Sequence, residues 1–136
     1  MTALQIIIDI LLAYAPLNAA IGGRVYPVSA PQKATLPYIV VNRVSEDEGE
    51  ILSGASGILE ARMSVSVVAS SAGDADLIGE VANKALRNVT GLQLSEGSPP
   101  VAASVTVRRD GSDFTDHSDD RSVTRRVIDY RIEGRW

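Results

Sequence analysis

The sequence contains no cysteine, and this absence removes several kinds of chemistry at once. Without thiols the chain has no disulfide, no thiolate metal site and no cysteine nucleophile. The lack of cysteine fits synthesis in a reducing cytoplasm. No motif calls for a cofactor, and none is expected.

Aromatic residues are also scarce, with one Phe, one Trp and four Tyr, and the formal net charge is −4. Proteins that stack nucleic-acid bases place aromatic side chains beside basic ones, and this chain has few aromatic side chains to supply. A negative chain also repels phosphate backbones. We therefore expect DNA that passes nearby to be bound without specificity or not at all. Because 45% of its 136 residues are hydrophobic, the chain suits one globular domain spanning residues 1–136.

The apolar N-terminus reads as an amphipathic helix. No Lys or Arg precedes Arg24 and Asp9 interrupts the apolar run, so neither a signal peptide nor a membrane-spanning segment is expected. Thr2 can cap the helix, and Pro16 should end it near Tyr14. The apolar face consists of Leu4, Ile7, Ile8, Leu11 and Leu12.

Prolines recur after the turn at Gly22-Gly23. Pro27, Pro31 and Pro37 each fix φ and lack an N–H, so this segment should form an irregular, extended arm. Residues 38–44 read as a strand, and glycines make 45–57 loop-like. That loop carries the acidic residues Glu46, Asp47, Glu48 and Glu50.

The second half alternates between strand and helix patterns. Residues 58–69 have a period of two and predict a strand with one buried face. A helix capped by Ser71 should run to Gly91, with Leu77 on its apolar stripe. Two strands, over 101–107 and 127–132, flank a polar loop at 110–121. We predict an α+β fold, with a mainly antiparallel sheet and two helices packed on one face.

The single histidine lies among acids, which raises the question of metal binding or catalysis. His117 neighbours Asp113, Asp116, Asp119 and Asp120, but their spacing matches no calcium-binding pattern. No G-x-S-x-G turn presents a serine, and the acids at 46–50 share one solvated environment unsuited to paired acid and base roles. We interpret 110–121 as a solvated hairpin tip and assign no catalytic or metal residues. A small metal-dependent hydrolase using His117 stays the alternative from a different class.

An ordered set of short motifs resembles a known family. In this sequence the motifs are Gly23-Arg24-Val25-Tyr26-Pro27, Ala30-Pro31-Gln32, Leu36-Pro37-Tyr38-Ile39-Val40, Gly54 with Gly57, and Ala85-Leu86. Their order and spacing resemble the tail-completion, or tail-terminator, proteins of long-tailed phages and gene transfer agents. The resemblance covers about residues 3–90. Where that family often has an aromatic residue near the end of the central strand, this chain has Val67-Val68-Ala69.

The resemblance implies a structural, non-enzymatic protein located in the tail or neck of a virion. It implies a homo-oligomeric ring, usually of six subunits, that caps the tail tube and stops its polymerisation. Its partners would be the tail-tube protein and the head–tail connector or stopper protein, with no role for a membrane. A head-side connector or stopper, or a tail-tube subunit, is the alternative within virion assembly.

Two sets of residues are candidates for contacts in such a ring. A proline-rich arm is already extended, so it loses less entropy when it lies across a neighbouring subunit. The candidate inter-subunit residues on the arm are Arg24, Tyr26, Pro27, Pro31, Pro37 and Tyr38. Acidic loops facing a lumen or a partner would keep DNA from sticking. These acids are Glu46, Asp47, Glu48, Glu50, Asp113, Asp116, Asp119 and Asp120.

Overall fold

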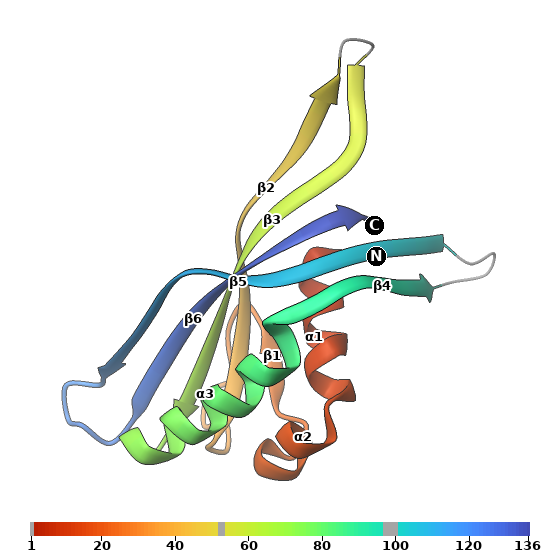
Figure 1. Cartoon of the computed structure of the whole chain (residues 1–136). Coiled ribbons are helices and arrows are strands. Elements are labelled where there is room, and N and C mark those ends of the chain that lie inside the picture. The colour runs from red at the N-terminus through yellow and green to blue at the C-terminus, as the bar shows by residue number, and fades with distance from the viewer. Residues whose placement is uncertain (1, 52–53, 97–100) are drawn as a thin grey trace.

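A computed structural model describes residues 2–51, 54–96 and 101–136, and Figure 1 shows its arrangement. The α+β class predicted from the sequence is confirmed, although the described residues hold three helices rather than two. The elements in chain order are α1 (Ala3–Ala13), α2 (Ala15–Ile21), β1 (Val25–Pro27), β2 (Tyr38–Ile51), β3 (Gly54–Ala69), α3 (Ala72–Leu86), β4 (Asn88–Glu96), β5 (Val101–His117) and β6 (Thr124–Arg135).

The six strands form one sheet in the order β1-β2-β3-β6-β5-β4. The sheet is mixed, which corrects the expectation of a mainly antiparallel one. Strand β1 pairs with β2 in parallel, with Val25 opposite Ile39, whereas the β2–β3, β3–β6, β6–β5 and β5–β4 pairs are antiparallel. The parallel pair arises because the arm at 28–37 carries the chain back to the start of the sheet before β2 begins. A parallel neighbour needs such a return connection.

Two segments predicted as loops are largely strands. Strand β2 runs on to Ile51 and pairs with β3, so Glu46 lies opposite Ala61 and Glu48 opposite Leu59. Likewise β5 continues to His117, which leaves only residues 118–123 for the turn. Acidic side chains did not end either strand because antiparallel sheets tolerate a solvated face. Residues 52–53 and 97–100, parts of predicted loops, lie outside the described residues.

The two predicted helices begin where the sequence predicts, and α1 ends beside Tyr14 as predicted, whereas α3 ends earlier than predicted. Gln5 N donates to Thr2 Oγ1 at 3.1 Å, and Asp74 N donates to Ser71 Oγ at 3.2 Å, which confirms both caps. Helix α2 was not predicted: Pro16 ends α1 but is accommodated in the first turn of a new helix. Helix α3 stops at Leu86, not at Gly91. Gly91, with φ of 61°, instead occupies a bulge in β4, a strand that the sequence analysis missed.

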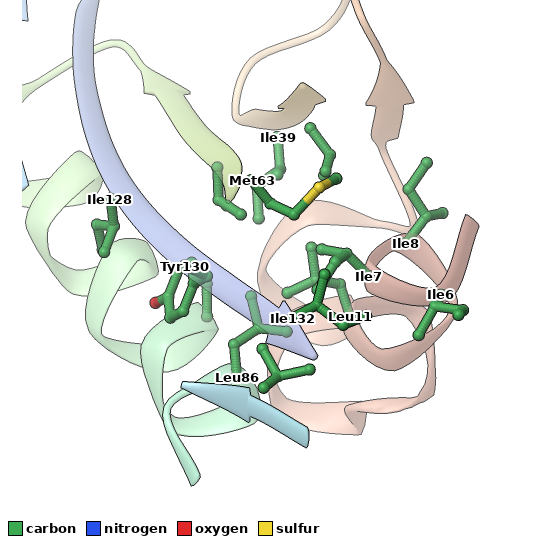
Figure 2. Close-up of a cluster of buried hydrophobic side chains, with 14 of the residues drawn as sticks. Ile6, Ile7, Ile8, Leu11, Ile39, Met63, Leu86, Ile128, Tyr130 and Ile132 are labelled. Carbon is green, nitrogen blue, oxygen red and sulfur yellow. The ribbon is translucent and has the colours of Figure 1, made fainter. Parts of the chain in front are cut away.

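Alternate positions of the strands supply the core. Ala61, Met63, Val65 and Val67 of β3 are buried as predicted, as are Ile128, Tyr130 and Ile132 of β6. They belong to one cluster with side chains of α1 and Leu86 of α3, and Figure 2 labels Met63, Ile128, Tyr130 and Ile132 among them. Leu77 does not join them, because 66% of its surface is exposed, contrary to prediction. Within the described residues no single helix is long and apolar enough to cross a membrane; α1 and α2 pass that test only together, bent by 88°.

One hydrogen bond crosses the core between α3 and β6. The Tyr130 hydroxyl donates to Asn83 Oδ1 at 2.7 Å, and Asn83 is only 4% exposed. Burial raises the pKa of Tyr130, so its hydroxyl stays a neutral donor. Removing the partner of a buried amide oxygen leaves that oxygen desolvated and unpaired, so this bond is costly to lose.

The substitution Tyr130→Phe should therefore lower the free energy of unfolding by about 1–3 kcal/mol, measured by urea denaturation. The ring would still fill its site, so the loss reports the stranded Asn83 oxygen. Tyr26→Phe is the matched control, because the Tyr26 hydroxyl makes no hydrogen bond to any described residue. Equal stability of the two variants would contradict the assignment.

Candidate assembly surface

The arm, here residues 24–37, is fastened to the edge of the sheet at both of its ends. Arg24 Nε donates to the Pro37 carbonyl oxygen at 3.0 Å, and Ile39 N donates to the Arg24 carbonyl oxygen at 2.9 Å. The Tyr26 and Tyr38 rings meet edge to face with centroids 5.8 Å apart. Aromatic pairs in this geometry stabilise by about 0.5–1.5 kcal/mol beyond their buried area. The arm is therefore a fixed part of the edge.

Between these fastenings the arm projects side chains outward. Val28 N donates to the Val41 carbonyl oxygen at 2.9 Å, yet the Val28 side chain is 64% exposed and its φ is 67°. Positive φ is unusual for a β-branched residue and marks local strain. Pro27 and Pro31 are exposed and Pro37 is partly buried. The predicted irregular arm is thus found over 28–37, preceded by β1, and its role between subunits stays a prediction.

The predicted acidic residues divide into exposed and paired groups. Glu46, Asp47 and Glu48 are exposed on β2, with Glu46 Oε2 3.8 Å from Arg43 Nη1. Glu50 also lies in β2, in a stretch whose side chains are outside the described part of the structure. The prediction that these acids lie on a loop was wrong, because they belong to strand β2. A role facing a lumen or a partner stays a prediction for them.

Asp113 belongs to a buried ionic cluster around Arg126. Arg126 Nε and Nη2 donate to the two carboxylate oxygens of Asp113 at 3.0 and 2.7 Å. Arg126 Nη2 also contacts Glu80 Oε1 at 2.9 Å, and Nη1 donates to the Asp76 carbonyl oxygen at 3.0 Å. Arg109 Nη2 adds a second cation to Asp113 at 2.5 Å. The cluster joins α3 to β5 and β6, so Asp113 is a structural residue and not an open loop acid.

The cluster sets the ionisation of its members. Hydrogen bonds from Arg126, helped by the charges of Arg126 and Arg109, lower the pKa of Asp113 below its ordinary value. Hydrogen bonds to Asp113 and Glu80 raise the pKa of Arg126 despite its burial. Both groups are therefore charged at neutral pH. Bidentate pairing with extra hydrogen bonds is what makes a buried guanidinium tolerable.

Two pairs of adjacent arginines, Arg108-Arg109 and Arg125-Arg126, form ion pairs within the β5–β6 hairpin. Arg108 Nη2 lies 2.8 Å from Glu133 Oε1, and Arg125 Nη2 lies 2.6 Å from Asp116 Oδ2. Further along the hairpin, Arg131 contacts Asp110 at 3.2 Å and Glu60 of β3 at 3.1 Å. These cations are balanced by carboxylates, which leaves little positive charge to attract nucleic acid.

The remaining acids and His117 do not come together as a site. Asp120, in the 118–123 turn, accepts hydrogen bonds from Ser118 and Ser122 that lower its pKa to about 2. His117 Nδ1 lies 2.9 Å from the Ser118 carbonyl oxygen, and Asp119 is exposed. Among the described residues no three His, Asp or Glu side chains are placed to hold a metal ion. Nothing in this geometry favours the hydrolase alternative.

Three functional features were missed from the sequence: the burial of Arg126, and the exposure of Leu77 and of Phe114. Phe114, the only phenylalanine, is 48% exposed on β5. A signal for Arg126 was available, because it lies two residues before Ile128 and so faces the same way as Ile128 and Tyr130. Leu77 was placed on the apolar stripe, but the buried face of α3 consists of Ala75, Ile78, Gly79, Ala82, Asn83 and Leu86, and Leu77 lies outside it.

Comparisons with known proteins identify the class to which this fold belongs. A chain from the virion of a native gene transfer agent particle has the same fold, with a TM-score of 0.68, 17% sequence identity and 98% of each chain covered. A second solved structure, at 12% identity and a TM-score of 0.54, covers 99% of this chain and 98% of its own. A search of the curated proteins found no match. The fold is therefore one found in a phage-like virion.

The family follows from the sequence match. The model of the family described as tail completion protein gp17 matches residues 5–132, and the chain belongs to this family. The tail-completion resemblance drawn from the motifs is confirmed. The protein is a structural component of the tail of a phage or phage-like virion.

Asp113→Asn should lower the free energy of unfolding at pH 7 by about 1.5–3 kcal/mol, because it weakens charge-assisted bonds to a buried guanidinium. The pKa of Asp113 is lower in the folded than in the unfolded state, so its stabilisation exists above about pH 4 and is lost as pH falls through the folded value. The gap between wild type and variant should thus close in acid, measured by denaturation from pH 7 to pH 2.

The control is Asp116→Asn, because Arg125 holds Asp116 with the same bidentate geometry on the exposed face. Exposed ion pairs contribute about 0–1 kcal/mol, so this variant should change little. Equal losses of unfolding free energy from the two substitutions would show that the Arg126 cluster contributes no more to stability than an exposed ion pair.

Gly79→Ala should destabilise the protein although alanine favours helices. An added Cβ at Gly79 would lie 2.8 Å from Arg126 Cδ and 2.9 Å from Nη1, so it would displace the guanidinium. Overpacking costs about 1–3 kcal/mol, against a gain of up to about 1 kcal/mol in helix propensity. Gly73→Ala, in the same helix with open space around it, should be neutral or stabilising in thermal melts. A Gly79→Ala variant as stable as Gly73→Ala would refute the packing argument.

Proposed function

We propose that the protein forms a homo-oligomeric ring, with six copies as the expected number, that caps the tail tube and ends its polymerisation. The opposite side of the ring joins the tail to the head connector or stopper protein. The observation that carries the proposal is the tail-completion family match over residues 5–132, nearly the whole chain. Residues 1–136 act as one assembly domain without catalytic residues.

The arm supports an interlocking ring. Its two ends are tied to the sheet edge by the Arg24–Pro37 and Tyr26–Tyr38 contacts, while Pro27, Val28 and Pro31 remain exposed between them. A segment held in one conformation loses little entropy when a neighbouring subunit covers it. The arm thus serves as the strap between adjacent subunits.

The acidic β2–β3 hairpin supports passage of DNA without binding. Glu46, Asp47 and Glu48 are exposed in sequence along β2. If this hairpin faces the lumen, its charge repels the phosphate backbone and lets DNA slide through. The acids that Arg125 and Arg126 neutralise, Asp116 and Asp113, contribute less to this repulsion.

A test in the particle separates the proposal from its alternatives. Deleting the gene should give tail tubes of excessive and variable length that do not attach to heads, as seen by negative-stain electron microscopy. Adding the purified protein to growing tubes should stop elongation and leave a ring at one end of each tube. The physical reason is that a bound cap occupies the surface to which the next tube subunit would add.

Other outcomes would identify other roles. Tubes of normal length that fail to join heads would point to a connector or stopper, and a complete lack of tubes would point to a tube subunit. Either result would overturn the tail-terminator proposal. A plasmid copy of the gene should restore normal tail length, which guards against effects on neighbouring genes.

A further inference from the structure

Both faces of the sheet bury apolar side chains, but only one face belongs to the core. Val40 of β2, Val68 of β3 and Val127 of β6 are at most 9% exposed, yet none of them is part of the core cluster. Successive side chains of a strand point to opposite faces, and the neighbours of Val40, Ile39 and Val41, are in that cluster. The three valines therefore lie on the second face of the sheet.

A cavity lies on this second face, between two segments from different parts of the sheet. The arm follows β1 at one edge, and the turn after His117 joins β5 to β6 on the far side of β3. Val28 of the arm and His117 line the same cavity, which has a volume of about 470 Å³. The strands between them supply Val40, Ser66 and Val68. The cavity, called here the Ser66 pocket, is in the size range of ligand sites.

The pocket contains two polar side chains without partners. Ser66 is 9% exposed, and its hydroxyl makes no hydrogen bond to a described residue. Among the described residues no polar side-chain atom is both sealed from solvent and unpaired, so this hydroxyl opens into the pocket. The Asn42 amide also lines the pocket and has no partner in the described part of the chain. Buried polar groups are normally paired, so both are open to a partner from outside the chain.

The strand register places these two polar groups close together. Val40 pairs with Ser66 and Asn42 pairs with Ser64, so Asn42 and Ser66 are diagonal neighbours on one face. Such neighbours are about 7–8 Å apart, and one peptide group can therefore lie between their side chains. A hydroxyl and a side-chain amide can each donate and accept a hydrogen bond, which matches the N–H and C=O of a peptide group.

The other residues of the pocket favour an uncharged ligand with an aliphatic side chain. Arg125 donates to both carboxylate oxygens of Asp116, at 3.0 and 2.6 Å, so these two charges neutralise each other. Val40 and Val68 offer apolar surface beside Ser66. Covering such surface with an aliphatic side chain is favourable. An extended, uncharged peptide segment therefore fits the chemistry of the pocket.

The position of the arm indicates where this segment comes from. In the proposed ring the arm lies between adjacent subunits, and the arm forms one wall of the pocket through Val28 and Ser29. A neighbouring subunit that covers the arm therefore also reaches the Ser66 pocket. The pocket is continuous with the proposed contact between copies of this chain.

We propose that the Ser66 pocket of one subunit binds an uncharged, extended segment of the next copy in the ring. A peptide group of that segment hydrogen-bonds to Ser66 and Asn42, and an aliphatic side chain packs on Val40 and Val68. The inference rests on the proposed ring and adds a binding site to the contact made by the arm. The pocket and the segment are different surfaces, so the contact is heterologous and repeats until the ring closes.

Filling the pocket tests this contact. Ser66→Leu should raise the protein concentration needed for half-assembly at least about tenfold, because the larger side chain occupies the space of the incoming segment. Ser66→Ala removes only the hydroxyl and should raise that concentration about two- to tenfold. Sedimentation velocity and native mass spectrometry give the oligomer masses, and thermal melts verify that each variant is folded.

Ser64→Leu is the matched control. Ser64 precedes Ser66 by two residues on the same face of β3 but does not line the pocket. This variant should assemble like wild type. Equal losses of assembly from Ser64→Leu and Ser66→Leu would overturn the assignment to the pocket.

A cross-linking experiment identifies the occupant without changing Ser66. The chain has no cysteine, so Ser29→Cys introduces a single thiol on the exposed wall of the pocket. After labelling with a benzophenone maleimide and irradiation of assembled rings, we expect cross-linked dimers of this chain, joined through an uncharged segment identified by mass spectrometry. Cross-links only to tail-tube protein, or none between copies, would overturn the proposal.

The outcomes separate this inference from the proposed function. Rings that form from Ser66→Leu as readily as from wild type would overturn the pocket contact and leave the ring intact. A wild type that stays monomeric alone and with tail tubes would overturn the ring itself, and the pocket contact with it.

Discussion

Arg126 lies on the face of β6 that α3 covers, in line with Ile128 and Tyr130, where an apolar residue would be expected. Its guanidinium donates to Asp113, Glu80 and the Asp76 carbonyl oxygen, and so ties one helix to two strands. The absence of a side chain at Gly79 makes room for it. An unpaired buried charge is so unfavourable that these partners have to hold their positions together. The local structure where α3 meets β5 and β6 depends on this constraint.

The contacts of α3 with the sheet change in kind along the helix. Its buried face is made by Ala75, Ile78, Gly79, Ala82, Asn83 and Leu86, and Leu77 lies outside that face. Arg126 packs against Gly79, Asn83 and Tyr130 make the next polar link, and beyond it Leu86 enters the apolar cluster (Figure 2). The helix is thus held by ionic contacts in its middle and by apolar packing at its end.

The sequence predicted the strands whose faces differ in polarity and the helices with clear caps. Met63, Val65 and Ile132 alternate with polar neighbours, so their burial could be predicted directly from the sequence. Three strand segments could not be predicted from the sequence: the acidic extension of β2, the part of β5 beyond Arg109, and β4. Polar residues in paired strands resemble a loop in a single sequence. Helix α2 was hidden by Pro16, whose place in a first turn depends on where α1 ends. The arm was found through its prolines, whereas the Arg126 cluster depends on contacts between segments far apart in the sequence.

The short parallel strand β1 has a further consequence for a protein made in many copies. Three residues ending in Pro27 leave no long row of free donors at that edge, because proline has no N–H. Open sheet edges otherwise invite identical chains to stack into fibres. The edge instead presents an irregular segment with two residues of positive φ, Val28 and Lys33, which a flat strand cannot copy. Newly made chains are thereby protected from aggregation through this edge while they wait for a tail.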